Sequence, residues 1–339
     1  MEIVSFVILH YKDIEVTDRC VRSILQMEDP ENRIRILIVD NDIGEKWEKR
    51  QQLQFRYGQD SRITVLPIME NGGFSYANNK GYRLAREQEE ISYIIVLNND
   101  IEFPQKNFLE LLDKSYEQHP CHILGPDIIR QGTGEHQNPM DTRLRTREEA
   151  QFTVRMNRLA LKFYPVLYPL VSWKLNREEK ARLQQKAENE TFYQTVQENI
   201  VPFGACLIFT PEFVKQEEVA FTPETQFFYE EYILTGRCRK KGYRIVYDPA
   251  LQAYHESGSA TKAEFAVKKE RTARTARSTA QKHAARNAQS AAQKHTARNA
   301  QSAAQKHTAR TVRRAARRRT RFMLERTAAA AEIYLKTLD

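Results

Sequence analysis

Short apolar runs alternate with helical patterns along the first hundred residues of the chain. Four runs rich in β-branched residues predict buried strands at Ile3–Leu9, Ile34–Val39, Ile63–Pro67 and Tyr93–Leu97. Between them, apolar residues recur every three or four positions over Val16–Leu25 and Tyr76–Gln88, which predicts helices. This alternation is typical of an α/β fold with a mainly parallel sheet and helices on both faces.

After residue 100 the pattern is less regular. It predicts a helix at Phe108–Tyr116, strands at Ile123–Pro126 and Val201–Phe209, a helix that ends at Gly242, and a last core strand at Tyr243–Tyr247. Residues 130–199 are charged, apart from the apolar stretch Leu159–Trp173, which two prolines interrupt. Such a stretch cannot span a bilayer, and its aromatic side chains fit a lid on the sheet, a binding cleft or a membrane interface.

Polar residues follow two of the predicted strands at the point where each strand ends. Asn98, Asn99 and Asp100 come directly after one of them, and Asp40 ends an earlier one. The carboxyl ends of parallel strands line one crevice, so carboxylates at two such ends predict a shared ligand site. The same residue types also form Asx turns and helix caps, and the pattern alone leaves both interpretations open.

A glycine pair lies between these two strand ends, in the segment 70–81. Gly72 and Gly73 let the backbone approach a ligand closely, and the predicted helix behind them offers free N–H groups to a phosphate. The segment lacks both the Gly-Lys-Ser/Thr of a Walker loop and the G-x-G-x-x-G of dinucleotide binding. A turn followed by a helix cap therefore remains an alternative to a ligand loop.

Two carboxylates and a histidine late in the chain complete the candidates. Glu230 and Glu231 begin a predicted helix whose last turn is basic, an arrangement that the helix dipole alone would explain. His255 lies in the polar segment 254–261, where a histidine can serve structure as well as chemistry.

The net charge of +9 comes from the end of the chain. The tail, residues 263–339, holds 19 Lys/Arg and 5 Asp/Glu, whereas the remaining residues hold 34 and 39. The basic balance therefore does not indicate that residues 1–262 bind nucleic acid. Four cysteines without a Cys-x-x-Cys spacing disfavour a zinc site or disulfide framework and fit a reducing cytoplasm. The apolar residues 1–9 are too short for a signal peptide or membrane span.

A twelve-residue unit repeats in the tail. Copies begin at Ser278, Ser290 and Ser302 and contain no large apolar residue. Because they cannot bury a core, we expect a solvated helix or a disordered segment. Arginines followed by Phe322–Leu324 and Ile333–Leu335 predict a basic amphipathic end that suits an anionic membrane. A repeat without function is the alternative.

Taken in order, these motifs resemble those of the family 2 glycosyltransferases with a GT-A type, Rossmann-like fold, over residues 2–261. Within that family the chain is similar to rhamnosyltransferase-type enzymes of bacterial surface polysaccharide synthesis. The resemblance rests on Val4–Tyr11, Val39–Asn41, Asn71–Phe74, Asn78–Asn79, Leu97–Asp100, Gly204–Leu207, Phe227–Glu231, Gly242–Tyr243, His255 and Ser259–Thr261. It implies a glycosyltransferase domain at residues 1–262, with 130–199 as a variable acceptor-side insert, followed by the tail.

The resemblance also implies a role for each candidate residue. The expected donor-nucleotide residues are Asp40, Asn41, Asn71, Gly72, Gly73, Asn78, Asn79, Asn98 and Asn99. Asp100, at the last position of a D-x-D motif, and His255 would hold Mn²⁺ or Mg²⁺, with Glu102 on the same strand face as a further candidate. Glu231, beside Glu230, would be the catalytic base. Two positions depart from the family, since Asn98 replaces the first acid of D-x-D and Glu231 replaces the usual aspartate.

The function that the resemblance implies is the inverting transfer of a sugar from a UDP- or dTDP-linked donor to a saccharide or lipid-linked saccharide acceptor. The metal would neutralise the leaving diphosphate, and Glu231 would take the proton of the acceptor hydroxyl. We expect a cytoplasmic enzyme at the inner face of the plasma membrane, with its tail on anionic lipid and no specific nucleic acid partner. The alternative is a non-catalytic, nucleotide-binding α/β protein whose basic tail binds nucleic acid or membrane.

Overall fold

A computed structural model describes most of the chain. The described residues are 2–42, 47–70, 72–88, 90–164, 167–171, 173–174, 177, 190–223, 225, 229–256 and 294–338, without the side chains of 48, 49, 190 and 294–315. The predicted domain boundary between 262 and 263, and the first repeat at Ser278, lie outside these residues.

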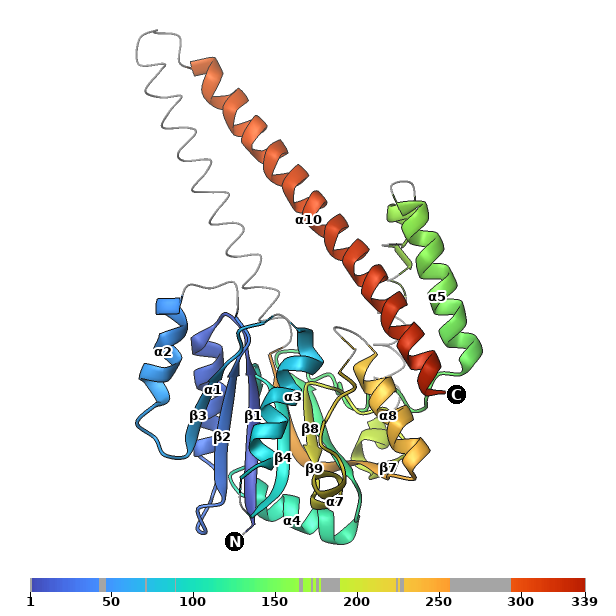
Figure 1. The fold of residues 1–339 in the computed structure, drawn as a ribbon. Coiled ribbons are helices and arrows are strands. Elements are labelled where there is room, and N and C mark those ends of the chain that lie inside the picture. Colours follow the sequence, from blue (N-terminus) through green and yellow to red (C-terminus); the bar gives the residue numbers. More distant parts are fainter. Residues whose placement is uncertain are drawn as a thin grey trace.

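Nine strands of the described residues form one sheet (Figure 1). They are β1 (Ile3–His10), β2 (Ile34–Asp40), β3 (Ile63–Pro67), β4 (Ile91–Asn98), β5 (Ile101–Glu102), β6 (Ile123–Arg130), β7 (Gln197–Glu198), β8 (Cys206–Phe209) and β9 (Ile245–His255). Their order is β3-β2-β1-β4-β8-β6-β9-β5, and β7 also pairs with β9. The first four strands are parallel, β8 runs antiparallel to both β4 and β6, and β6 and β9 are parallel.

Helices cover both faces of the sheet (Figure 1). The helices are α1 (Ile14–Leu25), α2 (Trp47–Tyr57), α3 (Gly73–Arg86), α4 (Phe108–Gln118), α5 (Arg147–Lys162), the 3₁₀ helix η1 (Glu190–Gln194), α7 (Pro211–Gln216), α8 (Glu230–Lys241) and α10 (Lys294–Thr337). One apolar cluster joins the sheet to α1 and α4, and a second joins it to α3, α7 and α8. This arrangement confirms the predicted α/β fold with helices on both faces.

Local signals explain where several helices begin and end. The Asp13 carboxylate accepts hydrogen bonds from the first turn of α1, at 3.0 Å from the amide of Glu15. Thr146 and Glu149 form a reciprocal capping box at the start of α5. Gly242 ends α8 at φ 71°, a left-handed conformation that glycine adopts without strain, as the sequence predicts.

Several elements differ from the prediction, among them α5, α7, β5 and β7, for which no helix or strand was predicted. Helix α2 was not predicted, because few of its residues are apolar. The strand predicted at Val201–Phe209 begins only at Cys206, and Val201 instead makes an isolated bridge with Asp141. Strand β9 continues past Tyr247 to His255, because a shift in its register with β6 accommodates Pro249 within the strand.

The end of α10 packs on α5 and α8 rather than standing alone in solvent (Figure 1). Leu324 joins Ala160 and Tyr164 of the α5 region in one apolar cluster, and Tyr334 joins Tyr229 and other residues in another. Part of the apolar set that the sequence assigned to a membrane-facing end is therefore buried inside the protein, because α5 provides apolar partners. Among the described helices, none combines the length and the apolar character that crossing a bilayer requires.

Candidate functional site

The carboxyl ends of three neighbouring strands meet at one edge of the sheet. His10 at the end of β1 pairs with Asp40 at the end of β2, and Leu9 pairs with Asn98 at the end of β4. The side chains behind these ends are also connected, because the hydroxyl of Thr17 lies 2.6 Å from Nδ1 of His10 and accepts a hydrogen bond from Asn99 at 2.9 Å. The strand-end residues singled out from the sequence therefore share one edge.

Asp40 is buried and ion-paired. Nε of Arg50, on α2, lies 2.6 Å from Oδ2 of Asp40, and the amide of Asp42 donates to Oδ1 at 3.1 Å. Arg50 also donates to the main-chain carbonyls of Asp40 and Ile68, at 3.0 and 2.8 Å. Such a buried charge pair is tolerated because each charge is hydrogen-bonded. Sequence reasoning missed Arg50, because α2 itself was not predicted.

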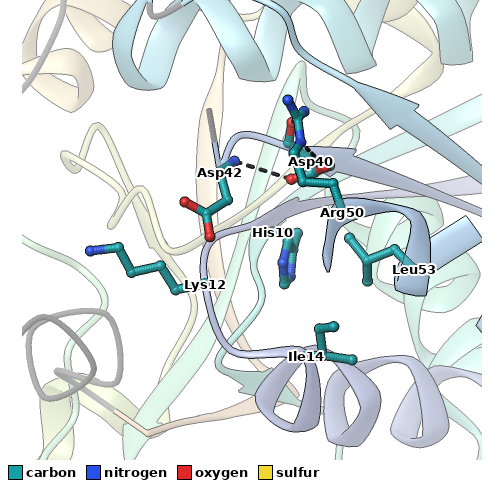
Figure 2. Close-up of a pocket in the computed structure, with 7 residues that line it drawn as sticks. All are labelled: His10, Lys12, Ile14, Asp40, Asp42, Arg50 and Leu53. Carbon is teal, nitrogen blue, oxygen red and sulfur yellow. Dashed lines mark hydrogen bonds and ion pairs between the residues drawn. The ribbon is translucent and has the colours of Figure 1, made fainter. Parts of the chain in front are cut away.

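A small pocket opens beside this ion pair (Figure 2). Its lining consists of His10, Lys12, Ile14, Asp40, Asp42, Arg50 and Leu53, around about 250 Å³ of space that includes the part open to solvent. Burial lowers the pKa of His10 to about 4, although Asp40 and Asp13 act in the opposite direction. His10 is thus neutral at pH 7, and the pocket presents one polar but uncharged ring between charged residues.

The predicted donor-nucleotide residues on α3 lie at the same edge but play different local parts. Gly72 directly precedes α3, and a Cβ there would lie 2.2 Å from Cγ of Tyr76, so only glycine fits. The side-chain amide of Asn79 donates to the carbonyl of Phe221 at 2.8 Å and accepts from its main-chain amide at 2.9 Å, and so fixes the segment around Phe221. Asn78 is fully buried, and neither polar atom of its side chain has a hydrogen-bond partner among the described residues.

Three other predicted donor-nucleotide residues are Gly73, Asn41 and Asn71. Gly73 opens α3 with φ 83°, in the left-handed region. The main-chain amide of Asn41 donates to His10, while its buried Oδ1 has no partner within the described part of the chain. Asn71 lies outside the described residues. Asn41 and Asn78 thus contain buried polar atoms that lack a hydrogen-bond partner among the described residues.

Asp100 and His255, the two predicted metal ligands, lie together. Both are buried, and Nε2 of His255 is 3.2 Å from Oδ1 of Asp100. The other ring nitrogen, Nδ1, lies 2.6 Å from Oε1 of Gln137, an acceptor to which a proton on Nδ1 would be donated; that tautomer leaves Nε2 to bind a metal ion. A carboxylate oxygen and an imidazole nitrogen that face each other are a donor set that fits a divalent cation.

Glu102 does not join this pair. Its carboxylate lies 3.3 Å from Nε of Arg19 on α1, in a partly exposed ion pair. In the part of the chain that the structure describes, no group of three or more His, Cys, Asp or Glu side chains is arranged to hold a metal. A site with two protein ligands is still sufficient where phosphate oxygens and water complete the coordination shell, as is usual for Mg²⁺.

Glu230 and Glu231 occupy the first turn of α8. The main-chain amide of Gly204 donates to Oε1 of Glu231 at 3.3 Å. Burial raises the pKa of Glu231, although this amide and the helix N-terminus lower it. Burial, and then the neighbouring Glu231, raise the pKa of Glu230 to about 8, and its Oε1 has no hydrogen-bond partner among the described residues. Two adjacent carboxylates therefore differ in environment, since the Gly204 amide donates to Glu231, whereas Oε1 of Glu230 lacks a partner among the described residues.

The segment Phe203–Ala205 connects Glu231 to the metal-ligand pair. The carbonyl of Ala205 accepts from the amide of Asn98, at the end of β4, at 2.9 Å. The ring of Phe203 lies 5.9 Å from the ring of His255, between centroids. Gly204, between Phe203 and Ala205, donates its main-chain amide hydrogen to the carboxylate of Glu231. The candidate base and the candidate metal ligands therefore lie around the same three-residue segment.

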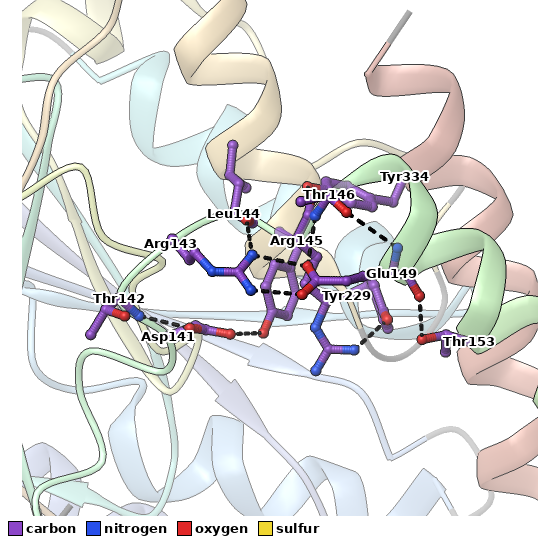
Figure 3. A network of polar contacts seen from close by, with 11 residues as sticks. Asp141, Thr142, Arg143, Leu144, Arg145, Thr146, Glu149, Thr153, Tyr229 and Tyr334 are labelled. Atoms are coloured by element: carbon purple, nitrogen blue, oxygen red, sulfur yellow. Dashed lines mark hydrogen bonds and ion pairs between the residues drawn. The ribbon is translucent and has the colours of Figure 1, made fainter.

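A polar and aromatic network braces the start of α8 (Figure 3). Arg145 donates to the hydroxyl of Tyr229 at 2.6 Å, and its guanidinium lies over the rings of Tyr229 and Tyr232. The hydroxyl of Tyr334, on α10, donates to the carbonyl of Arg145 at 2.6 Å. Because Tyr229 adopts φ 64° directly before Glu230, the network holds a conformation that a non-glycine residue rarely adopts.

The model of glycosyl transferase family 2 matches residues 5–192, more than half of the chain. Asp40 and Asp100 lie within this match, whereas Glu231 and His255 follow it. No curated protein matches the chain.

Several solved structures are similar to the chain at low identity. GalNAc-T7, crystallised with UDP, GalNAc and Mn²⁺, has a TM-score of 0.51 at 13% identity, over 75% of this chain and 43% of that one. Residues 1–349 of the S. aureus protein TarS have a TM-score of 0.44 at 14% identity, over 76% of this chain and 62% of that one. The same protein with UDP-GlcNAc has a TM-score of 0.45. The chain spans less than two thirds of each of these relatives.

Proposed function

The chain belongs to glycosyl transferase family 2, and we propose that it is an inverting glycosyltransferase that moves a sugar from a nucleotide-sugar donor to a saccharide or lipid-linked saccharide acceptor. The observation that carries the proposal is the grouping of Asp100, His255 and Glu231 around the segment Phe203–Ala205. The finer assignment, a cytoplasmic, rhamnosyltransferase-like enzyme of bacterial surface polysaccharide synthesis, belongs to the same proposal.

Asp100 and His255 are the residues that would hold a divalent metal ion against the donor diphosphate. Such an ion, when bound, neutralises the charge that builds on the leaving nucleoside diphosphate. The nitrogen ligand from His255 favours Mn²⁺ over Mg²⁺, because Mg²⁺ takes oxygen ligands. Gln137 supports the arrangement by keeping the proton of His255 on Nδ1.

Glu231 is the general base in this proposal. It takes the proton of an acceptor hydroxyl while that oxygen attacks the anomeric carbon on the face opposite the diphosphate, so one displacement inverts the configuration. A pKa raised by burial makes Glu231 a stronger base than an exposed glutamate, and the Gly204 amide orients the carboxylate. Asp40, Asn41, Gly72, Gly73 and Asn78 form the nucleotide side of the site.

The test is a donor-turnover assay with a panel of UDP- and dTDP-linked sugars, with and without Mn²⁺. UDP-linked sugars are the first choice because the fold neighbour GalNAc-T7 was crystallised with UDP. We expect release of nucleoside diphosphate that requires the metal and is lost in Asp100→Asn and in Glu231→Gln. Glu102→Gln is the matched control, because Glu102 is a carboxylate two residues from Asp100 that pairs with Arg19, and it should keep activity.

Two results would contradict the proposal. One is metal-independent turnover that survives in Asp100→Asn. The other is tight nucleotide binding by the full chain without turnover of any donor, which would favour the non-catalytic nucleotide-binding alternative. A loss of activity in Glu102→Gln as large as that in Asp100→Asn would contradict the assignment of the metal to Asp100 and His255 without Glu102.

A further inference from the structure

Helix α5 is apolar on two opposite faces. One face packs against α10 through residues such as Ala150, Val154 and Ala160, all of which are buried. The other face carries large apolar side chains that are exposed, from α5 into the segment that follows it: Phe152, Met156, Leu159, Phe163, Leu170 and Trp173, between 39% and 60% exposed. A helix with two apolar faces is expected to lie between two apolar partners, and only one of them is present in the described residues.

The four exposed residues on α5 and at its end form one continuous stripe. Positions 152, 156, 159 and 163 follow each other at intervals of four, three and four residues, which places them on one side of a helix. Figure 1 shows α5 at the margin of the molecule, beside the C-terminal end of α10. Six of the eleven exposed large apolar residues of the described chain lie between Phe152 and Trp173, and four of them make up this stripe, so the exposure is concentrated and not scattered.

Cations outnumber acids along the stripe, where the acids are Glu148 and Glu149 at the start of α5 and Glu332 of α10, which pairs with Arg158. Residues 150–177 contain Arg155, Arg158, Lys162, Lys174 and Arg177 but no Asp or Glu. The ammonium of Lys162 lies 5.6 Å from the ring centre of Phe163, and the guanidinium of Arg177 lies 5.4 Å from that of Trp173. Apolar side chains flanked by long cationic ones are the pattern of a helix that lies in the headgroup region of an anionic bilayer.

Helix α10, which packs on the other face of α5, brings further positive charge close to it. It runs antiparallel to α5, since Arg158 pairs with Glu332 whereas the hydroxyl of Tyr164 donates to the carbonyl of Arg317, earlier in α10. Arg318 and Arg319 next to that contact are exposed. The cations also disfavour a second copy of the chain as the partner, because two copies that meet through the stripe would bring like charges together.

We propose that the exposed apolar stripe of α5 is the surface by which this protein docks on an anionic lipid bilayer. The inference goes beyond the proposed function and relocates the expected membrane contact from α10, whose Leu324 and Tyr334 are buried, to α5. Docking in this way would hold the α5–α10 pair, and with it the start of α8, next to a lipid-linked acceptor.

The test is co-sedimentation of the full chain with vesicles of phosphatidylcholine, alone or mixed in equal amounts with phosphatidylglycerol. We expect binding to the mixed vesicles that weakens as salt is raised. The triple variant Phe152→Gln, Leu159→Gln, Phe163→Gln should lower the partition coefficient by roughly tenfold for each side chain removed. Phe55→Gln is the matched control, because Phe55 is 89% exposed on α2 and should leave binding unchanged.

A second readout uses Trp173. In a Trp47→Phe background it is the one remaining tryptophan, and its fluorescence should shift to shorter wavelength on binding mixed vesicles. Three results would overturn the proposal: no binding to mixed vesicles, equal binding of wild type and triple variant, or a wild-type dimer that the triple variant converts to a monomer, which makes the stripe a contact between copies. The assay contains no nucleotide sugar, so its outcome is separate from that of the donor-turnover assay.

Discussion

Replacing Gly204 with alanine should impair the candidate base without unfolding the protein. A Cβ at this position would lie 2.8 Å from Oε1 of Glu231, whereas ordinary contact begins at 3.4 Å, so the carboxylate has to move by about 0.6 Å. The hydrogen bond from the Gly204 amide is already long, at 3.3 Å, and this displacement breaks it. A hydrogen bond to a charged group contributes about 1.5–3 kcal/mol, and the long distance favours the lower value.

This loss predicts a roughly tenfold fall in kcat, because 1.4 kcal/mol corresponds to a factor of about ten. Since the Gly204 amide lowers the pKa of Glu231, Gly204→Ala should also move the acidic limb of the rate profile to higher pH. The assay is steady-state donor turnover against pH, with thermal melting to check the fold. Gly236→Ala is the control, because Gly236 lies on α8 but faces Thr337 of α10. An unchanged kcat and pH profile in Gly204→Ala would refute the role of this contact.

Three further predictions concern stability. Burial raises the pKa of Glu230 to about 8, so the stability that this group contributes is present below pH 4.5 and is lost as the pH rises toward 8. Glu230→Gln should therefore stabilise the protein by about 3 kcal/mol at pH 7 and by almost nothing at pH 4. Urea titrations at the two pH values measure this difference. Arg50→Met leaves the buried carboxylate of Asp40 without its cation and should cost about 3–5 kcal/mol, most of which Asp40→Asn in the same chain should restore. Tyr334→Ala should release the end of α10 to limited proteolysis, whereas Tyr334→Phe, which keeps the ring against Tyr229, should not.

The fold was predictable from the sequence where the signal is local. The apolar runs that end at Asp40 and Asn98 are parallel strands in the structure, and their pairing with β1 brings both ends to one edge. The direction of β8 was not predictable, because four apolar residues do not indicate which way a strand runs. The likeness to family 2 glycosyltransferases, read from the order of the motifs, is confirmed by the family match.

The site could be predicted only in part, for a physical reason. The resemblance to family 2 glycosyltransferases implied that Asp100 and His255 serve one site, and in the structure Nε2 of His255 lies 3.2 Å from Oδ1 of Asp100. The same reasoning could not predict that the amide of Asn79 is occupied by Phe221, because that contact joins positions 142 residues apart. Arg50 was missed for the same reason, since its partner is known only once α2 is placed on β2.

The packing of α10 also depends on contacts between residues far apart in the sequence, which sequence patterns do not predict. Tyr334 looks like one apolar residue in a basic helix, and its burial depends on Tyr229 and Tyr232 of α8, about a hundred residues earlier. The stripe on α5 became visible only when the structure showed which apolar face of that helix α10 covers. The roles of the individual site residues and the domain boundary at residue 262 stay predictions.

The measurement that tests the central claim most directly is isothermal titration of UDP, and then dTDP, into the full-length protein with and without Mn²⁺. The account predicts that one of these nucleotides binds roughly tenfold or more tightly with the metal, and that Asp100→Asn removes this gain. Equal affinity with and without Mn²⁺ for both nucleotides, or a gain that persists in Asp100→Asn, would contradict it.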